Sequence, residues 1–351
     1  MKNGKITIYD IAGEAQVSTA TVSRVLAKHP GVSAKTQARV SRVIEKYHFK
    51  PSTVARGLYQ QTSHMLGILL PGVLSPYYAA LYAAAYDAAR ASGYALLTFH
   101  TSPSDSISMA AIGELIERRL DGALLLGGIV EAVHPQDSLA ELLGVLQRHM
   151  PIVTICPPIA GVDCVNFHSD LSYSVRQSVR HLHALGHQRI AFLGGSLESR
   201  SAGEREMGFR DEMSRVGLSA EYRHEAGHTP EAGEMGVLRM LTPLSPKTRP
   251  TALIAINDLV ALGAMRQLKR MGLRIPEDIA IIGCDNQFFS PYTDPPLTTV
   301  DLHPGDLGRI AVQQLIATLT EDRDNLFFSQ VKEATLVIRE SCGARLGRRA
   351  L

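Results

Sequence analysis

From Met65 onward, the sequence alternates between short apolar runs and longer stretches whose apolar residues recur at helical spacing. The strand-like runs are 66–70, 95–99, 123–126, 152–155, 164–167, 190–193, 253–256 and 279–282. The helical stretches are 77–91, 106–119, 138–149, 171–185, 203–215, 231–241, 258–271 and 305–319. Such alternation is typical of parallel sheets covered by helices. About ten strands divide more naturally into two sheets than into one, so we expect an α/β body with two lobes.

The first fifty residues follow a different pattern, which predicts three short helices over 8–15, 19–26 and 34–47. Thr7, Ser18 and Ser33 precede these helices, and their hydroxyl groups can cap the first turns. Each helix has one apolar stripe, so the three can share a small core. The first two helices are joined by a three-residue turn, which matches the helix-turn-helix pattern of DNA-binding proteins.

The outward face of the second predicted helix suits the major groove of DNA, and it carries no acidic side chain. The guanidinium of Arg24 can donate two parallel hydrogen bonds to a guanine. Ala20 and the methyl group of Thr19 can contact the methyl group of a thymine. These side chains are therefore candidates for reading the base sequence.

Hydroxyl groups and net charge also favour DNA as the partner of this segment. Thr21, Ser23 and Thr36 can donate to phosphate oxygens, which fixes the register without reading the sequence. Residues 1–64 contain ten Lys/Arg and three Asp/Glu and so carry a charge of +7, whereas the whole chain carries only +2. A basic N-terminal segment on an acidic body indicates an anionic partner for the first part alone.

The segment V-S-T-A-T-V-S-R-V-L at 17–26, followed by V-S-A-K-T at 32–36, resembles the headpiece of the LacI/GalR (lactose repressor) family of bacterial transcriptional regulators. The resemblance implies that Thr19, Ala20 and Arg24 read bases and that Tyr9 lies at a position that contacts the DNA backbone. Ala27 stands where the family commonly has Asn. The residues expected to contact DNA are Tyr9, Ser18, Thr19, Ala20, Thr21, Ser23, Arg24, Thr36 and Leu58.

Residues 51–64 form a predicted hinge between the headpiece and the body. Its helical stretch is too short to hold alone, because nucleating a helix costs more than one turn returns. In the resembling family this segment folds on DNA, pairs with its twin in the dimer and enters the minor groove. The motif A-R-G-L places Leu58 where the family has its intercalating leucine. We therefore expect the hinge to be the switch, since it lies near its folding midpoint.

The body resembles the type I periplasmic sugar-binding protein fold, which the same family uses as its sensor domain. The motifs that carry this resemblance are L-G-I-L-L-P at 66–71, S-P-Y-Y-A at 75–79, D-G-A-L-L-L at 121–126, H-L-H-A-L-G-H-Q-R-I-A-F-L-G-G at 181–195, R-E-M-G-F-R at 205–210, I-N-D-L-V-A-L-G-A at 256–264, I-P-E-D-I-A-I-I-G-C-D at 275–285 and P-P-L-T-T-V at 295–300. The expected organisation is a headpiece at 1–50, a hinge at 51–64 and an effector-binding domain at 65–351. Its first lobe should span about 65–165 plus 296–322, and its second about 166–295 plus 323–345.

Candidate effector-binding residues follow the predicted strands, because parallel α/β sheets bind ligands at the carboxyl ends of their strands. Tyr77 and Tyr78 could stack on a sugar or base, or could simply pack in the first helical turn. The resemblance implies that Arg205 and Asp285 grip the effector. Asn257 matches a polar pocket position, whereas Asp258 is expected to cap a helix. The full set of candidates is Tyr77, Tyr78, Asp170, Ser201, Arg205, His228, Asn257 and Asp285.

The sequence gives little support to an α/β enzyme with a DNA-binding appendage. The motifs G-x-x-x-x-G-K-[ST], G-x-G-x-x-G and H-E-x-x-H do not occur. His181, His183 and His187 are close in sequence, but residues two apart on a helix point to different sides. We therefore expect no catalytic site, cofactor or metal.

The expected function is a cytoplasmic repressor, since its four cysteines form no C-x-x-C pair and no run of about 20 apolar residues occurs. It should act as a homodimer on a pseudo-palindromic operator under the control of a sugar or sugar derivative. An alternative is a response to a nucleobase or phosphorylated corepressor, or to a protein partner.

Overall fold

The computed structural model describes residues 6–26, 29–49, 62–72, 74–100, 109–127, 138–196, 199–320 and 330–344. Contacts divide the chain into two compact units, Met1–Ser63 and His64–Leu351. The predicted hinge helix with Leu58 lies outside the described residues, as does Ala27. Within the described part of the chain, no helix combines the length and the apolar character needed to cross a bilayer.

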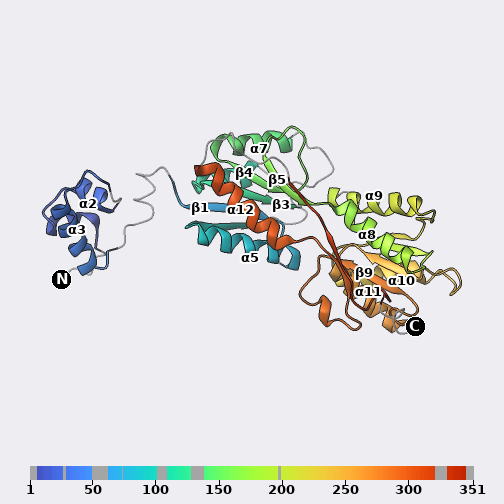
Figure 1. Cartoon of the computed structure of the whole chain (residues 1–351). Coiled ribbons are helices and arrows are strands. Elements are labelled where there is room, and N and C mark those ends of the chain that lie inside the picture. The colour runs from blue at the N-terminus through green and yellow to red at the C-terminus, as the bar shows by residue number, and fades with distance from the viewer. Residues whose placement is uncertain are drawn as a thin grey trace. The chain divides into compact units, whose positions relative to one another are not determined.

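The described residues of the first unit form three helices around a small apolar core (Figure 1), as the apolar stripes predict. The helices are α1 (Ile8–Glu14), α2 (Thr19–Leu26) and α3 (Ala34–Lys46). Ile11, Val22 and Val40, one from each helix, have no exposed surface. Each apolar stripe is therefore buried against the other two.

The starts of these helices are fixed by short-range hydrogen bonds of the predicted kind. Ser33 Oγ accepts from the backbone N–H of Thr36 at 3.4 Å, and Ser18 Oγ accepts from that of Thr21 at 3.2 Å. At α1, the carboxylate of Asp10 accepts from the backbone N–H of Thr7 at 2.7 Å. These bonds satisfy N–H groups that the first turn of a helix leaves without a partner.

The first lobe of the second unit is a six-stranded parallel sheet in the order β11-β5-β4-β3-β1-β2. Its strands are β1 (Met65–Leu70), β2 (Ala95–His100), β3 (Gly122–Leu126), β4 (Ile152–Ile155), β5 (Val165–Ser169) and β11 (Gln330–Lys332). Apolar clusters pack α5 (Pro76–Ala91) and α12 (Pro304–Thr320) on one face, and α6 (Met109–Glu117) and α7 (Ser138–His149) on the other. Because both faces are covered, strands such as β3 are buried along their whole length.

The second lobe is also six-stranded, in the order β12-β10-β9-β8-β6-β7. Its strands are β6 (Ile190–Gly194), β7 (Arg223–Glu225), β8 (Ala252–Ala255), β9 (Ala280–Cys284), β10 (Thr298–Asp301) and β12 (Thr335–Val337), of which β12 runs antiparallel to β10. One face carries α8 (Leu171–Ala184) and α9 (Arg200–Arg215), and the other carries α10 (Pro230–Leu241) and α11 (Asp258–Arg270). The two-lobed α/β architecture agrees with the sequence prediction.

Helices α10 and α11 approach each other so closely that they require glycine at the contact. A Cβ atom on Gly263 would lie 1.7 Å from the carbonyl oxygen of Pro230, and one on Gly233 would lie 2.1 Å from that of Val260. Backbone atoms cannot move aside as a flexible side chain can, so these two glycines set the distance between the helices.

The described chain passes between the two sheets at three crossovers, 169–171, 301–304 and 332–335. The predicted lobe boundaries place three strands in the other lobe. In the structure β5 and β11 pair in the first sheet, and β10 pairs in the second. The reason is that an apolar run predicts a strand but not its partner, so the prediction put the three crossovers before β5, β10 and β11 instead of after them.

Candidate functional site

The predicted DNA-binding side chains that the structure describes are accessible on the headpiece. Ser18, Ala20 and Arg24 are exposed, and Thr19, Thr21, Ser23 and Thr36 are partly exposed. Tyr9 on α1 is 76% exposed, which is high for a residue type that is usually partly buried. The buried residues of α2 are Val22 and Val25, so the helix turns its polar face outward.

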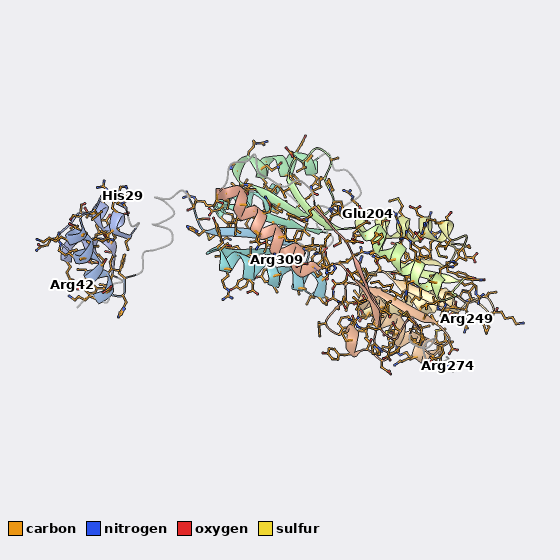
Figure 2. The ribbon with its side chains drawn as sticks, viewed as in Figure 1. His29, Arg42, Glu204, Arg249, Arg274 and Arg309 are labelled. Carbon is orange, nitrogen blue, oxygen red and sulfur yellow. The ribbon has the colours of Figure 1, made fainter. Side chains whose placement is uncertain are left out.

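The two acidic groups of α1 are engaged within the headpiece. The Thr7 hydroxyl and backbone N–H lower the pKa of Asp10 by donating to its carboxylate. Lys46 Nζ lies 2.6 Å from Glu14 Oε1, and this bond lowers the pKa of Glu14. Arg42 on α3, labelled in Figure 2, is one of the basic residues of the unit. The surface therefore offers positive charge and hydroxyl groups to a polyanion.

A cavity of about 780 Å³ lies in the body between elements of both lobes. Leu74, Pro76, Ala79 and Ala80 line it from the first lobe. From the second lobe it is lined by the loop Asp285–Phe288, which directly follows β9. The crossover before α12 and the first turn of α12 supply Asp301, His303, Pro304, Gly305 and Asp306. The cavity therefore joins an apolar wall to a polar wall, as small-molecule sites commonly do.

Arg205, His228 and Asp285 are brought together at the carboxyl ends of the second sheet. Arg205 on α9 is 8% exposed, and its Nη1 donates to the carbonyl oxygen of Ser201 at 3.3 Å. Burial raises the pKa of Asp285, and the charge of Arg205 opposes that rise. Removal from water, aided by Arg205, lowers the pKa of His228. Arg205 thus interacts with both groups, although Asp285 is the one of the three that lines the cavity.

The other candidate residues are engaged in local structure. Tyr77 packs in apolar clusters of both lobes, and the hydroxyl of Tyr78 lies over Gly127. Asp170 caps α8 by accepting from the N–H of Tyr173 at 2.7 Å. Ser201 Oγ lies 2.9 Å from Ser199 Oγ. The expected role in effector binding stays a prediction for all of them.

Asn257 has the capping role that was expected of Asp258. Asn257 is the residue that caps α11, since its Oδ1 accepts from the N–H of Val260 at 2.8 Å, and its Nδ2 donates to the carbonyl oxygen of His228 at 3.2 Å. Asp258 is fully buried, and its pKa is raised to about 6 by that burial. The prediction that Asp258 caps the helix is therefore wrong.

The carboxylate of Asp258 instead anchors the loop that lines the cavity. Oδ2 accepts from the N–H of Gln287 at 2.8 Å and from the hydroxyl of Ser290 at 2.6 Å. Oδ1 accepts from the hydroxyl of Thr299 on β10 at 2.6 Å. Three donors compensate the cost of burying the carboxylate, and they fix the loop relative to β10.

Sequence reasoning missed most of the lining of the cavity, including Leu74, Gln287, Asp301 and His303. The signal for Gln287 was present, because it lies two residues after Asp285 at a strand end. Asp301 and His303 could be found only by knowing that the chain crosses between lobes there.

Comparison with known proteins identifies the family. Residues 7–52 match the family described as bacterial regulatory proteins, lacI family, and residues 179–342 match the periplasmic binding protein-like domain. The HTH-type transcriptional repressor PurR of Pasteurella multocida is 32% identical over 342 residues, which cover 97% of this chain and 99% of that protein. The chain belongs to the lacI family of bacterial regulatory proteins. The ribose operon repressor of Haemophilus influenzae is 28% identical and covers 95% of this chain and 98% of that protein.

Solved structures agree with this assignment to the lacI family. The Lac repressor, in a crystal structure of its dimer bound to operator and the anti-inducer ONPF, matches with a TM-score of 0.85 at 27% identity. The match covers 97% of this chain and 99% of that chain. The lacI-family chain is thus a DNA-binding transcriptional regulator controlled by a small-molecule effector, and not an enzyme, which confirms the prediction.

Proposed function

We propose that this regulator is a homodimeric repressor that binds a pseudo-palindromic operator. A small polyhydroxylated metabolite, a sugar or sugar derivative, binds in the cavity between the lobes and either lowers or raises the affinity for the operator. The observation that carries the proposal is the cavity of about 780 Å³, which has an apolar wall on one lobe and a hydrogen-bonding wall on the other.

The lining of the cavity supports a sugar. The exposed side chain of Leu74 and the partly exposed side chain of Pro76 offer apolar surface to the C–H face of a sugar ring. The carboxylates of Asp285 and Asp301 can each accept from ligand hydroxyl groups, and the charge of Arg205, which lies outside the lining, acts on Asp285. A ligand that touches both walls would favour one arrangement of the lobes, and that preference is what shifts operator affinity.

The polar face of α2 supports the groove assignment, with Arg24, Ala20 and Thr19 reading bases and the hydroxyl residues contacting phosphates. A dimer would present two headpieces to two half-sites, so the operator should be pseudo-palindromic. The Lac repressor structure, which holds a dimer on operator DNA, supports the same assembly for this chain. We propose that the protein acts in the cytoplasm, where its DNA lies.

The relatives do not select one effector class, since they include repressors named PurR as well as a ribose operon repressor. The test therefore uses several classes. The full chain is first used to enrich operator sequences from random duplex DNA. Thermal-shift screening against sugars, sugar acids, phosphosugars and nucleosides then selects ligands for operator titration by fluorescence anisotropy.

A sugar or sugar derivative that changes operator affinity would support the proposal, and the sign of the change would distinguish induction from corepression. A nucleoside or phosphosugar that acts where free sugars do not would replace the sugar assignment. Failure to enrich any duplex at low salt would overturn the proposed DNA-binding role.

A further inference from the structure

The turn that follows β9 touches both the cavity and the crossover between the lobes. Asp285 and Asn286 have φ angles of +102° and +48°, which lie in the left-handed region that non-glycine residues rarely adopt. Both residues line the cavity. Two consecutive residues are held in this conformation only if their surroundings determine it strongly.

Hydrogen bonds to β10 and to Arg339 hold this turn. The N–H of Asp285 donates to the carbonyl oxygen of Val300 at 2.7 Å, and the N–H of Asn286 donates to Thr299 Oγ1 at 3.2 Å. Asn286 Oδ1 accepts from Arg339 Nη2, which follows β12, at 2.7 Å. Asn286 Nδ2 donates to Asp301 Oδ2, at the end of β10, at 3.0 Å. The amide of Asn286 therefore lies between a cation and a carboxylate: its oxygen accepts from Arg339 and its nitrogen donates to Asp301.

Asp301 is the first residue of the crossover from the second lobe to α12 of the first lobe. Its Oδ1 accepts from the N–H of His303 at 2.7 Å, while its Oδ2 accepts from Asn286. The imidazole of His303 lies 3.0 Å from Thr335 Oγ1, in another crossover. The hydroxyl of Ser169, in the remaining crossover, donates to the carbonyl oxygen of Leu302 at 2.7 Å. The three crossovers are thus joined by hydrogen bonds, and Asp301 connects them to the cavity.

We propose that Asn286 is a positioning residue that acts through its hydrogen bond to Asp301. It transmits the state of the cavity to the three crossovers, which together form the hinge between the lobes and are distinct from the predicted hinge at 51–64. This inference rests on the proposed effector cavity and names the first step by which its occupancy would move the lobes. A ligand that binds the carboxylate of Asp285 acts on the adjacent residue of a rigid turn. Movement of that turn must shift or break the bond to Asp301, because Asn286 is also tied to Arg339.

Substitutions of Asn286 and Asp301 test whether the hydrogen bond between them has this role. In Asn286→Asp the new carboxylate can still accept from Arg339, but it loses the donor to Asp301 and places two carboxylates within hydrogen-bonding distance. In Asp301→Asn an amide donor would face the amide donor of Asn286. In the double variant, Asn at 301 can donate to Asp at 286, while its oxygen still accepts from the N–H of His303. The two substitutions should therefore compensate each other.

The experiment measures hydrogen–deuterium exchange of hinge peptides covering 299–305 in the full chain, with neither DNA nor effector present. We expect each single variant to exchange about tenfold faster than wild type in these peptides, and the double variant to return close to wild type. The control is Gln147→Glu, which also replaces an amide by an acid and removes one donor bond, from Nε2 to the carbonyl oxygen of Asp163. That bond lies in the first lobe, outside the crossovers, so the control should leave the hinge peptides unchanged.

The exchange rates of the single and double variants decide whether Asn286 acts through Asp301. Additive effects, or a double variant worse than both single variants, would overturn the inference, as would equal hinge exchange in Asn286→Asp and Gln147→Glu. If Asn286→Asp does not fold, recovery of folding and of slow hinge exchange in the double variant still supports it, and failure to recover refutes it. Because no effector or operator is used, this result is independent of the failure of any metabolite to shift operator affinity, which would count against the proposed function alone.

Discussion

A substitution at Gly283 in β9 tests the buried hydrogen bonds of Asp258 that hold the loop lining the cavity. A Cβ atom at this position would lie 2.2 Å from Asp258 Oδ1 and 3.1 Å from Leu297 Cδ2. Gly283→Ala must therefore displace the carboxylate by about 1 Å, since an ordinary contact is about 3.4 Å or longer. That displacement breaks the 2.6 Å hydrogen bond from Thr299.

The expected cost of Gly283→Ala combines two effects. Losing a hydrogen bond to a charged group costs about 1.5–3 kcal/mol. Overpacking a core position costs about 1–3 kcal/mol. We therefore expect the free energy of unfolding of the body to fall by roughly 3–5 kcal/mol, which corresponds to roughly 10 °C in Tm for a domain of this size.

Urea and thermal unfolding followed by circular dichroism would measure this change. Gly203→Ala is the matched control, because Gly203 lies in α9 of the same lobe and a Cβ there would meet no atom within 4 Å. Replacing an open helical glycine by alanine should stabilise the protein by up to about 1 kcal/mol. If Gly283→Ala lost less than about 1 kcal/mol relative to wild type, the tight packing of Asp258 against β9 would be refuted.

Three further predictions concern binding and pH. Arg24→Ala should cost about 1–3 kcal/mol of operator affinity and relax specificity at one base position; an unchanged sequence preference in a mutated-operator series would contradict the groove assignment. Arg205→Ala should abolish the response to effector while leaving basal operator binding intact, and a normal response would remove Arg205 from the site. Asp258 has a pKa of about 6 in the folded state against 3.8 ordinarily, so its contribution to stability should decline by up to about 3 kcal/mol as pH rises from about 4 to 6. The difference in unfolding free energy between wild type and Asp258→Asn, measured by urea at pH 4 and pH 7, should change by that amount; a constant difference would show that Asp258 does not titrate in this range.

The strands that were predicted from the sequence are those that consist mainly of apolar residues. All eight predicted runs form strands, because each is an uninterrupted or nearly uninterrupted apolar segment; except for the edge strand β2, they are buried between helices. The four that were missed, β7, β10, β11 and β12, have three or four residues each and include polar positions. Thr298 and Thr299 in β10 are completely buried, and their hydroxyl groups bond to Arg339 and Asp258. A hydropathy pattern cannot detect burial that is made possible by distant hydrogen-bond partners.

The lining of the cavity was predicted only in part, for a similar reason. Strand-end position drew attention to Asp285, which lines the cavity, because the carboxyl ends of parallel strands share one edge of the sheet. The same logic named Tyr77 and Tyr78, whose side chains pack against apolar clusters or lie over Gly127. Asn286 and Asp301 meet only because β9 and β10 pair in a particular register, with Cys284 opposite Val300. No local pattern in the sequence specifies that register.

The position of the Asp285–Asn286 turn explains how a small ligand could control a protein of this size. The turn lines the cavity, is anchored to β10 by backbone and side-chain bonds, and contacts the first residue of a crossover. A ligand bound deep in one lobe would have to deform a packed sheet in order to reach the other lobe, and packed cores resist such deformation. A ligand bound at this turn acts on a few hydrogen bonds next to the hinge, where a small displacement rotates a whole lobe. Effector control of this regulator should therefore be most sensitive to substitutions in the turn and the crossovers, and least sensitive to conservative changes in the apolar cores.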